Sequence, residues 1–375
     1  MLRSTVAFAG LGLALAMSGC GKSEPATADV GAPRSPETPA PTAPADAASA
    51  TPSVRSPADD WTSDKRARVI VRAVDPLPGP ERRVAIELDV LDPDSGLPVD
   101  ALDAGAMALS IDGQYVPGRY EVATFRDAGR SLGLALVLPA HKDYVAGPDP
   151  DQGLDISPLA EVKKGAEALL RRLRPNDRVT VFGLTEEGVK LLAPWGPPDA
   201  SVVAGLTPLT EAHPVPPGLY RALSKALVAI SEDSANLPAR RVVLTVSDGL
   251  DPLAEKQEQL TRRIAEAAGL ARTPEVHAEI WALGFTLAMP EPLVALEELV
   301  TKTGGRFRRV DFAGHKELGK RFEELGAEVE RGFVVTFTPD ADAAIPSSAK
   351  SVELALRLPS GAVGRAQVYS ENPVP

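Results

Sequence analysis

Between residues 131 and 331 the chain alternates short, almost purely apolar runs with longer segments of helical spacing. The first run, Leu132–Leu138, contains no polar side chain, which is typical of a strand buried on both faces of a sheet. Strands of this kind joined by helices form a parallel sheet with helices on both faces, because parallel neighbours need a crossover connection. The sequence therefore predicts an α/β fold with a doubly wound, mostly parallel central sheet flanked by helices.

The element boundaries follow from turn residues and caps. The first helix is expected to start near Ser157, with Pro158 in its first turn, and to stop at Pro175. The predicted strands of this part are 132–138, 177–184, 189–195, 240–249, 275–285 and 305–310. The predicted helices are 157–174, 217–232, 252–272, 290–304 and 316–331.

Two segments of a different pattern flank this part of the chain. Residues 66–128 and 332–371 contain short runs in which apolar and polar residues alternate, broken by Pro, Gly and Asp. Alternation with period two predicts antiparallel strands. The first segment is too small for an independent core, so we expect both to form one small antiparallel β domain into which an α/β domain at 130–331 is inserted.

The N-terminus is that of an exported chain. Arg3 precedes an apolar core, Val6–Met17, that is too short to span a membrane, and residues 1–19 are predicted to be a signal peptide. Met17–Cys20 resembles the lipobox of bacterial lipoproteins. This resemblance implies cleavage before Cys20, the only cysteine, and lipidation of its thiol; an ordinary signal peptide followed by a coincidental cysteine is the alternative.

Residues 20–62 are rich in Pro and Ala and contain almost no large apolar side chain. Such a segment cannot offset its ordering entropy by burial, and we expect a disordered tether to the membrane. The predicted location is the bacterial cell envelope, lipid-anchored and facing the periplasm or the cell surface.

Five segments in the α/β part together resemble a von Willebrand factor type A domain. They are "LGLALVL", "RPNDRVTVFGL", "GLYRAL", "RRVVLTVSDGLD" and "LVTKTGGRF", and they occur in the order and at the spacing of that family. The flanking stretch "DPDSGLPVDALDAGAMALSIDGQYV" also resembles segments beside such domains in secreted bacterial proteins.

The resemblance implies a divalent cation at the carboxyl end of the sheet in many family members. Its ligands are an Asp-x-Ser-x-Ser motif after the first strand, a Thr from a second loop and an Asp from a third. On this chain the leading Asp is replaced by Pro139, the first Ser by His141 and the second by Asp143. The Thr is replaced by Pro217, and only Asp248 matches.

Two oxygen donors are therefore missing, and Lys142 adds a positive charge beside the expected cation position. Because the number of oxygen ligands decides the affinity for magnesium and calcium, we expect a degenerate site with no metal and no other cofactor. Asp248 can instead cap a turn before Gly249. A residual cation site formed by Asp143 and Asp248, or a transition-metal site that adds His141, is the alternative.

Without a cation, recognition would use the side chains of the loops at this edge. The predicted rim consists of residues 139–144, 213–220 and 248–251, with Lys142, Tyr144, Pro216 and Asp251 as candidate partner contacts. Prolines in the second loop would stiffen it and so reduce the entropy lost on docking.

The remaining sequence features argue against several function classes. A formal net charge of −11 disfavours nucleic acid as a partner. The chain has no P-loop and no H-E-x-x-H motif, and lipidation would exclude Cys20 as a nucleophile. We expect no enzyme, but a membrane-anchored lipoprotein that binds an unknown envelope or extracellular protein. Cation-dependent adhesion and a structural envelope scaffold are the alternative functions.

Overall fold

The computed structural model describes residues 55–79, 81–139, 157–185, 188–206, 218–251, 256–286, 291–343 and 349–374. By internal contacts the chain divides into Met1–Thr51 and Pro52–Pro375, and all described elements belong to the second unit. The predicted signal peptide and Cys20 lie outside the described residues. None of the helices in the described ranges is both long enough and apolar enough to cross a bilayer.

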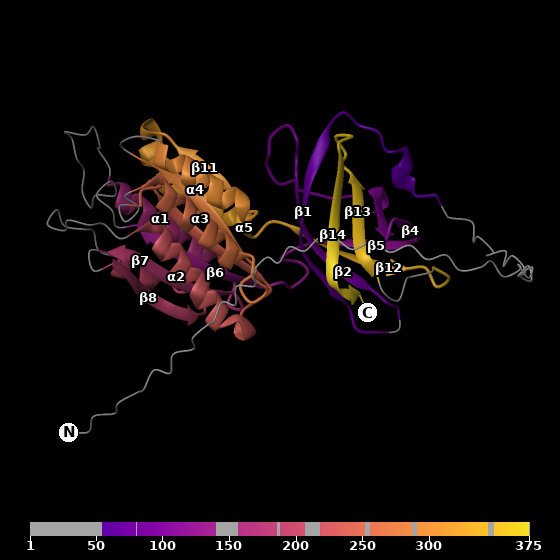
Figure 1. The fold of residues 1–375 in the computed structure, drawn as a ribbon, viewed down its shortest axis with the longest axis horizontal. Helices are drawn as coiled ribbons and strands as arrows, with labels where there is room; N and C mark the ends of the chain where they lie inside the picture. Colours follow the sequence, from indigo (N-terminus) through magenta and orange to yellow (C-terminus); the bar gives the residue numbers. More distant parts are fainter. Residues whose placement is uncertain are drawn as a thin grey trace, which may run out of the picture. The chain divides into compact units, whose positions relative to one another are not determined.

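A six-stranded sheet forms the centre of the α/β part (Figure 1). Its strand order is β11-β10-β9-β6-β7-β8, and every neighbouring pair is parallel except the β7–β8 hairpin. Every residue of β6 and β10 is buried, as apolar strands between two helix layers must be. The strands are β6 (Leu132–Pro139), β7 (Arg178–Thr185), β8 (Gly188–Gly196), β9 (Arg240–Ser247), β10 (Ala278–Phe285) and β11 (Phe307–Val310).

Helices cover both faces of this sheet, so the predicted doubly wound fold class is confirmed. Successive β6 side chains alternate between the layers: Leu134 and Leu136 share a core with α1 and α5, whereas Ala135 and Val137 share a core with α2, α3 and α4. The helices are α1 (Pro158–Arg172), α2 (Leu219–Glu232), α3 (Gln257–Ala271), α4 (Glu291–Lys302) and α5 (Leu318–Val329). The short 3-10 helices η4 (Ala200–Gly205), η5 (Ser234–Asn236) and η6 (Phe312–Glu317) lie between them in the chain.

The two flanking β segments form one eight-stranded sheet, as the sequence predicts. Its order is β4-β3-β13-β14-β1-β2-β12-β5, and all pairs are antiparallel except β1–β14. Side chains from both halves of the sheet, such as Leu88 of β2 and Leu354 of β13, share one core. The strands are β1 (Arg66–Pro76), β2 (Val84–Leu91), β3 (Met107–Ile111), β4 (Gln114–Val116), β5 (Gly118–Thr124), β12 (Phe333–Pro339), β13 (Ala349–Arg357) and β14 (Val363–Val374).

The first described residues, from 55 onwards, fall inside the range predicted for the tether. Residues Pro57–Asp60 form the 3-10 helix η1, capped by Ser56, and Ala58 is buried in a small cluster with Ala108 and Ala355. A second 3-10 helix, η2 (Ala104–Ala106), precedes β3. The few apolar atoms of this stretch therefore find a partner on the β domain, which composition alone does not reveal.

Candidate functional site

The carboxyl edge of the six-stranded sheet is the place where an open α/β sheet normally binds ligands. Strands β6 and β9 are parallel neighbours there, with Val137 opposite Thr245. Pro139 ends β6 as a buried residue, and Asp248, only 3% exposed, follows directly after β9. The structure therefore brings the ends of β6 and β9, at Pro139 and Ser247, to the same edge.

Asp248 has a clear local role in the turn after β9. Its Oδ1 accepts a hydrogen bond from the backbone nitrogen of Leu250 at 2.9 Å, and the Ser247 hydroxyl accepts one from Gly249 at 3.1 Å. Gly249 has φ +78°, a conformation that favours glycine. A Cβ on this glycine would lie 2.5 Å from the carbonyl oxygen of Pro292, so the turn packs directly against the start of α4.

Asp251 is buried rather than displayed. Its side chain is fully buried and its Oδ2 pairs with a guanidinium nitrogen of Arg263, on α3, at 2.9 Å. Burial, with further contributions from the carboxylates of Asp251 and Glu298, raises the pKa of Tyr220. The phenol of this residue is thus neutral at physiological pH. The predicted contact residue Asp251 therefore stabilises the fold beneath the rim.

Metal ligands are sparse in the part of this edge that the structure describes. Across the described ranges, no group of three Asp, Glu, His or Cys side chains could hold a metal ion. The remaining predicted positions lie outside the described residues, and their roles stay predictions: His141, Lys142, Asp143, Tyr144, Pro216 and Pro217.

Sequence reasoning missed Val294 at this edge. It lies on α4, next to the turn that packs on Pro292, and is 66% exposed. The helix buries Leu293, Leu296 and Leu299. Val294 falls outside this apolar stripe, and that position was the sequence signal that it is exposed. A large apolar side chain at the rim provides a contact that needs no charge.

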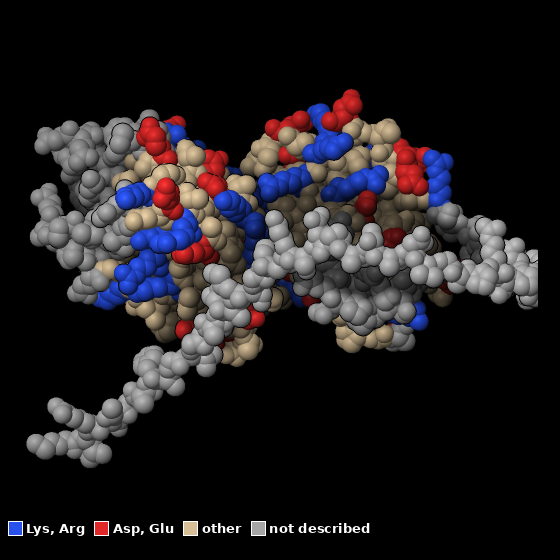
Figure 2. All heavy atoms as spheres, viewed as in Figure 1, with Lys and Arg blue, Asp and Glu red and all other residues tan. Residues whose placement is uncertain are grey.

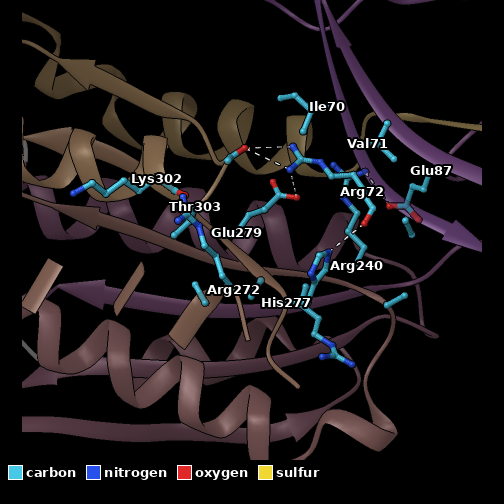
Figure 3. A pocket seen from close by; sticks show the side chains of 16 residues that line it. Ile70, Val71, Arg72, Glu87, Arg240, Arg272, His277, Glu279, Lys302 and Thr303 are labelled. Carbon is cyan, nitrogen blue, oxygen red and sulfur yellow. Dashed lines mark hydrogen bonds and ion pairs between the residues drawn. The ribbon is translucent and has the colours of Figure 1, made fainter. Parts of the chain in front are cut away.

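The amino edge of the same sheet is built differently, from buried ion pairs to the β domain. Arg72, at a bulge in β1, bonds to Asp89 at 2.8 Å and to Glu279 of β10 at 2.5 Å. Arg240, at the start of β9, lies 3.3 Å from Asp89 and 3.8 Å from Glu87, and its side chain is 1% exposed. Figure 3 shows Arg72, Glu87, Arg240 and Glu279 around a cavity of about 330 Å³ between β1 and the ends of β9 and β10.

The pKa values of these carboxyls depart from ordinary values in opposite directions. Burial is the largest influence on Glu87 and Glu279 and raises the pKa of both. Burial also acts to raise the pKa of Asp89, but Arg240 and Arg72 together outweigh it and hold that pKa below its usual value. Asp89 is the carboxylate that pairs with both arginines, at 2.8 Å from Arg72 and 3.3 Å from Arg240.

A second buried ion pair explains the phrase "RPNDRV" noted in the sequence. Asp177 is fully buried and accepts two hydrogen bonds from Arg126, at 2.8 and 2.9 Å. It also accepts one from the backbone nitrogen of Leu132 and one from that of Arg174, each at 2.8 Å. Glu330, at the end of α5, pairs with the same arginine at 3.0 Å. Arg126 therefore links the end of α5 to Asp177 and, through it, to the start of β6.

The chain passes from one sheet to the other between β5 and β6, and returns between α5 and β12. Phe125 joins these two connections. Its backbone nitrogen donates to the Gly332 carbonyl at 2.9 Å. The guanidinium groups of Arg240 and Arg126 lie 4.8 and 5.5 Å from the centre of its fully buried ring. Cations over an aromatic face add to the ion pairs. The amino edge thus joins the two sheets.

One short string at the amino edge imitates a catalytic motif. Residues 129–133 read G-x-S-x-G, which in α/β hydrolases follows a strand and places a nucleophilic serine on a sharp turn. Here Ser131 precedes β6, and its hydroxyl accepts a hydrogen bond from Asn176 at 2.7 Å. The string therefore lacks the strand-turn-helix context of a nucleophile elbow.

No protein-family model matches the chain, and no curated protein matches it. Among solved structures, a von Willebrand factor type A protein from Catenulispora acidiphila is 10% identical, over 82% of this chain and 75% of that chain, with a TM-score of 0.42. The PilB minor pilin from Streptococcus sanguinis is 8% identical over 71% and 78%, with a TM-score of 0.41. The vWF domain of the type V pili tip protein Mfa5 from Porphyromonas gingivalis is 10% identical over 53% and 95%, with a TM-score of 0.38. The fold assignment itself rests on the strand order and the two helix layers described above.

Proposed function

We propose that this protein is a non-enzymatic, lipid-anchored protein of the bacterial cell envelope. It binds another protein through the carboxyl edge of a von Willebrand factor type A-like domain that lacks a complete metal site. The observation that carries the proposal is Pro139, buried at the end of β6, where a metal site of this type needs a carboxylate.

The geometry around Asp248 supports recognition without a bridging cation. The Oδ1 atom of this residue is engaged by the backbone of its own turn, and Asp251 is paired with Arg263. Val294 supplies exposed apolar surface next to that turn. Apolar anchors surrounded by polar groups are the features that give protein interfaces their affinity.

The experiment is affinity capture of a partner from envelope extracts with the full chain, in magnesium and in chelator. We expect capture of the same partner in both conditions and its loss in Val294→Glu. The control is Leu97→Glu, which places the same charge on an exposed residue of the β domain, 45% exposed, and should leave capture unchanged.

Two outcomes would overturn the proposal. Capture that is lost in chelator and restored by magnesium would favour cation-dependent adhesion through Asp143 and Asp248. Absence of any partner that depends on the carboxyl edge would favour a structural envelope scaffold.

A further inference from the structure

A second surface of the α/β part runs along α2, from its first turn, next to the rim residue Tyr220, to its last turn at Glu232. This helix buries Ala222, Leu223 and Leu227 against the sheet and presents a stripe of exposed residues on its other side. The stripe consists of Arg221, Lys225, Val228 and Glu232, at spacings of four, three and four residues. This spacing places the four side chains along one line of the helix surface, so that a second helix can lie alongside them.

Two charged residues of the α2 stripe lie at the ends of the helix that the helix dipole disfavours for their sign. Arg221 lies in the first turn, where the helix dipole favours an anion, and Glu232 is the last residue, where it favours a cation. Arg221 and Lys225 are also like charges one turn apart, which is unfavourable in an isolated helix. The charges of these residues therefore do not stabilise α2 as an isolated helix.

The described part of the chain does not neutralise these charges either. The described ion pairs on the neighbouring helices α1 and α3 involve other residues, Arg171 with Glu167 and Arg262 with Glu266, and Lys225 donates to the Val189 carbonyl at 3.4 Å. Figure 2 shows acidic and basic side chains interspersed on the face of the α/β part in view. The α2 stripe thus offers a cation at one end and an anion at the other, both facing solvent.

The α2 stripe forms one wall of a groove of about 550 Å³ between α2 and the edge strand β8. Leu191 is 51% exposed there and Val228 is 42% exposed. The ring of Trp195 is held in place because its indole nitrogen donates to the Ala229 carbonyl at 3.1 Å. The groove is therefore preformed, and its apolar residues adjoin the middle of the charged stripe.

We propose that a second copy of this chain covers this surface, with the two α2 helices antiparallel about a twofold axis. The midpoint of the stripe lies between Ala226 and Leu227. An antiparallel copy consequently places each Arg221 beside the other copy's Glu232 and each Lys225 beside the other copy's Val228. One surface complementary to itself is what a twofold interface requires. The antiparallel arrangement also opposes the two helix dipoles.

Sedimentation equilibrium of the full chain carrying Cys20→Ser tests this proposal. We expect a monomer–dimer equilibrium. Arg221→Glu and Glu232→Arg should each weaken the dimer by about tenfold, because each turns two ion pairs into two like-charge contacts. The double variant restores opposite charges at both positions and should recover the wild-type dissociation constant. Lys164→Glu, an exposed substitution on α1 across the sheet, is the control and should have no effect.

Misfolding cannot account for the expected loss, because Arg221→Glu places an acid in the first turn and Glu232→Arg a base in the last, as the helix prefers. Circular dichroism verifies that each variant remains folded. A wild-type chain that stays monomeric would overturn the proposal. So would a dimer that is insensitive to both single variants, or one that the double variant fails to restore. The proposal does not depend on the function assigned to the carboxyl edge.

Discussion

The two edges of the six-stranded sheet use charge in different ways. At the amino edge Arg72, Arg126 and Arg240 are buried against carboxylates that come from distant parts of the chain. At the carboxyl edge Asp248 accepts a hydrogen bond within a local turn, and Asp251 pairs with Arg263 on a helix of the same domain. The ion pairs that join the two sheets lie at the amino edge.

The difference follows from what a buried ion pair can do. Its attraction roughly balances the cost of removing two charges from water, but losing one partner leaves an uncompensated charge and is expensive. Such pairs therefore favour one arrangement of the two sheets over others. At the carboxyl edge, which we propose to bind a separate protein, the buried pair formed by Asp251 and Arg263 stays within the α/β part.

The largest effect is expected at the amino edge, from Arg240→Met. The substitution leaves Asp89 and Glu87 without their shared cation, and we expect the free energy of unfolding to fall by about 3–5 kcal/mol. Arg262→Met is the control, because its ion pair with Glu266 is exposed and worth at most about 1 kcal/mol. Urea denaturation measures both. Equal losses in the two variants would show that the network at the amino edge does not stabilise the fold.

Asp89→Asn and Glu87→Gln should change stability in opposite directions at pH 7. The depressed pKa of Asp89 means that its ionised form stabilises the fold, a contribution present above its ordinary pKa and lost as pH falls through the depressed value. We expect Asp89→Asn to cost about 3 kcal/mol, since two arginines lose their carboxylate.

The pKa of Glu87 is raised, so its ionisation changes stability in the direction opposite to that of Asp89. Its contribution is favourable below the ordinary pKa and is lost as pH rises through the raised value, so Glu87→Gln should increase stability at pH 7. That gain should vanish below about pH 4, close to the ordinary pKa of a glutamate. Urea denaturation at several pH values measures both variants, and a loss of stability for Glu87→Gln at pH 7 would contradict this account.

A smaller effect is expected from a matched pair of glycines. Gly113 and Gly249 have the same φ of +78°, but a Cβ at Gly113 meets nothing within 4 Å, whereas at Gly249 it would meet Pro292. Gly113→Ala should cost about 1 kcal/mol from the backbone conformation alone. Gly249→Ala should cost a further 1–3 kcal/mol or so, because the turn must move away from α4. Equal costs in thermal or urea unfolding would mean that the Asp248 turn does not pack on that helix.

The sequence predicted the parts of the fold that depend on local pattern. Apolar runs such as Leu132–Leu138 predicted the buried strands. The sequence offered Asp155 or Ser157 as the cap of the first helix, and Ser157 caps α1 by accepting from the Ala160 nitrogen. Period-two alternation predicted the antiparallel strands, and the small size of the first β segment predicted that it needs the second one as a partner. The amino-edge network was not predicted, because Arg72 and Glu279 are distant in sequence and neither has a spacing that signals a partner.

For the candidate site, the sequence predicted which residues lie at the carboxyl edge but not which of their side chains are exposed. The resemblance placed Pro139 and Asp248 at one edge, and the strand order agrees. It did not show that Asp251 is buried against Arg263, because exposure depends on how the loop folds over α3. Val294 was missed because a single apolar residue on a helix surface is common in soluble proteins.

Isothermal titration calorimetry of the full chain, carrying Cys20→Ser, with magnesium, calcium and manganese tests the central claim most directly. We predict only heats of dilution at millimolar concentrations, for the wild type and for Asp248→Asn alike, because a carboxyl edge with prolines at two ligand positions supplies too few oxygens. Saturable binding of one cation per chain, abolished by Asp248→Asn, would contradict the account.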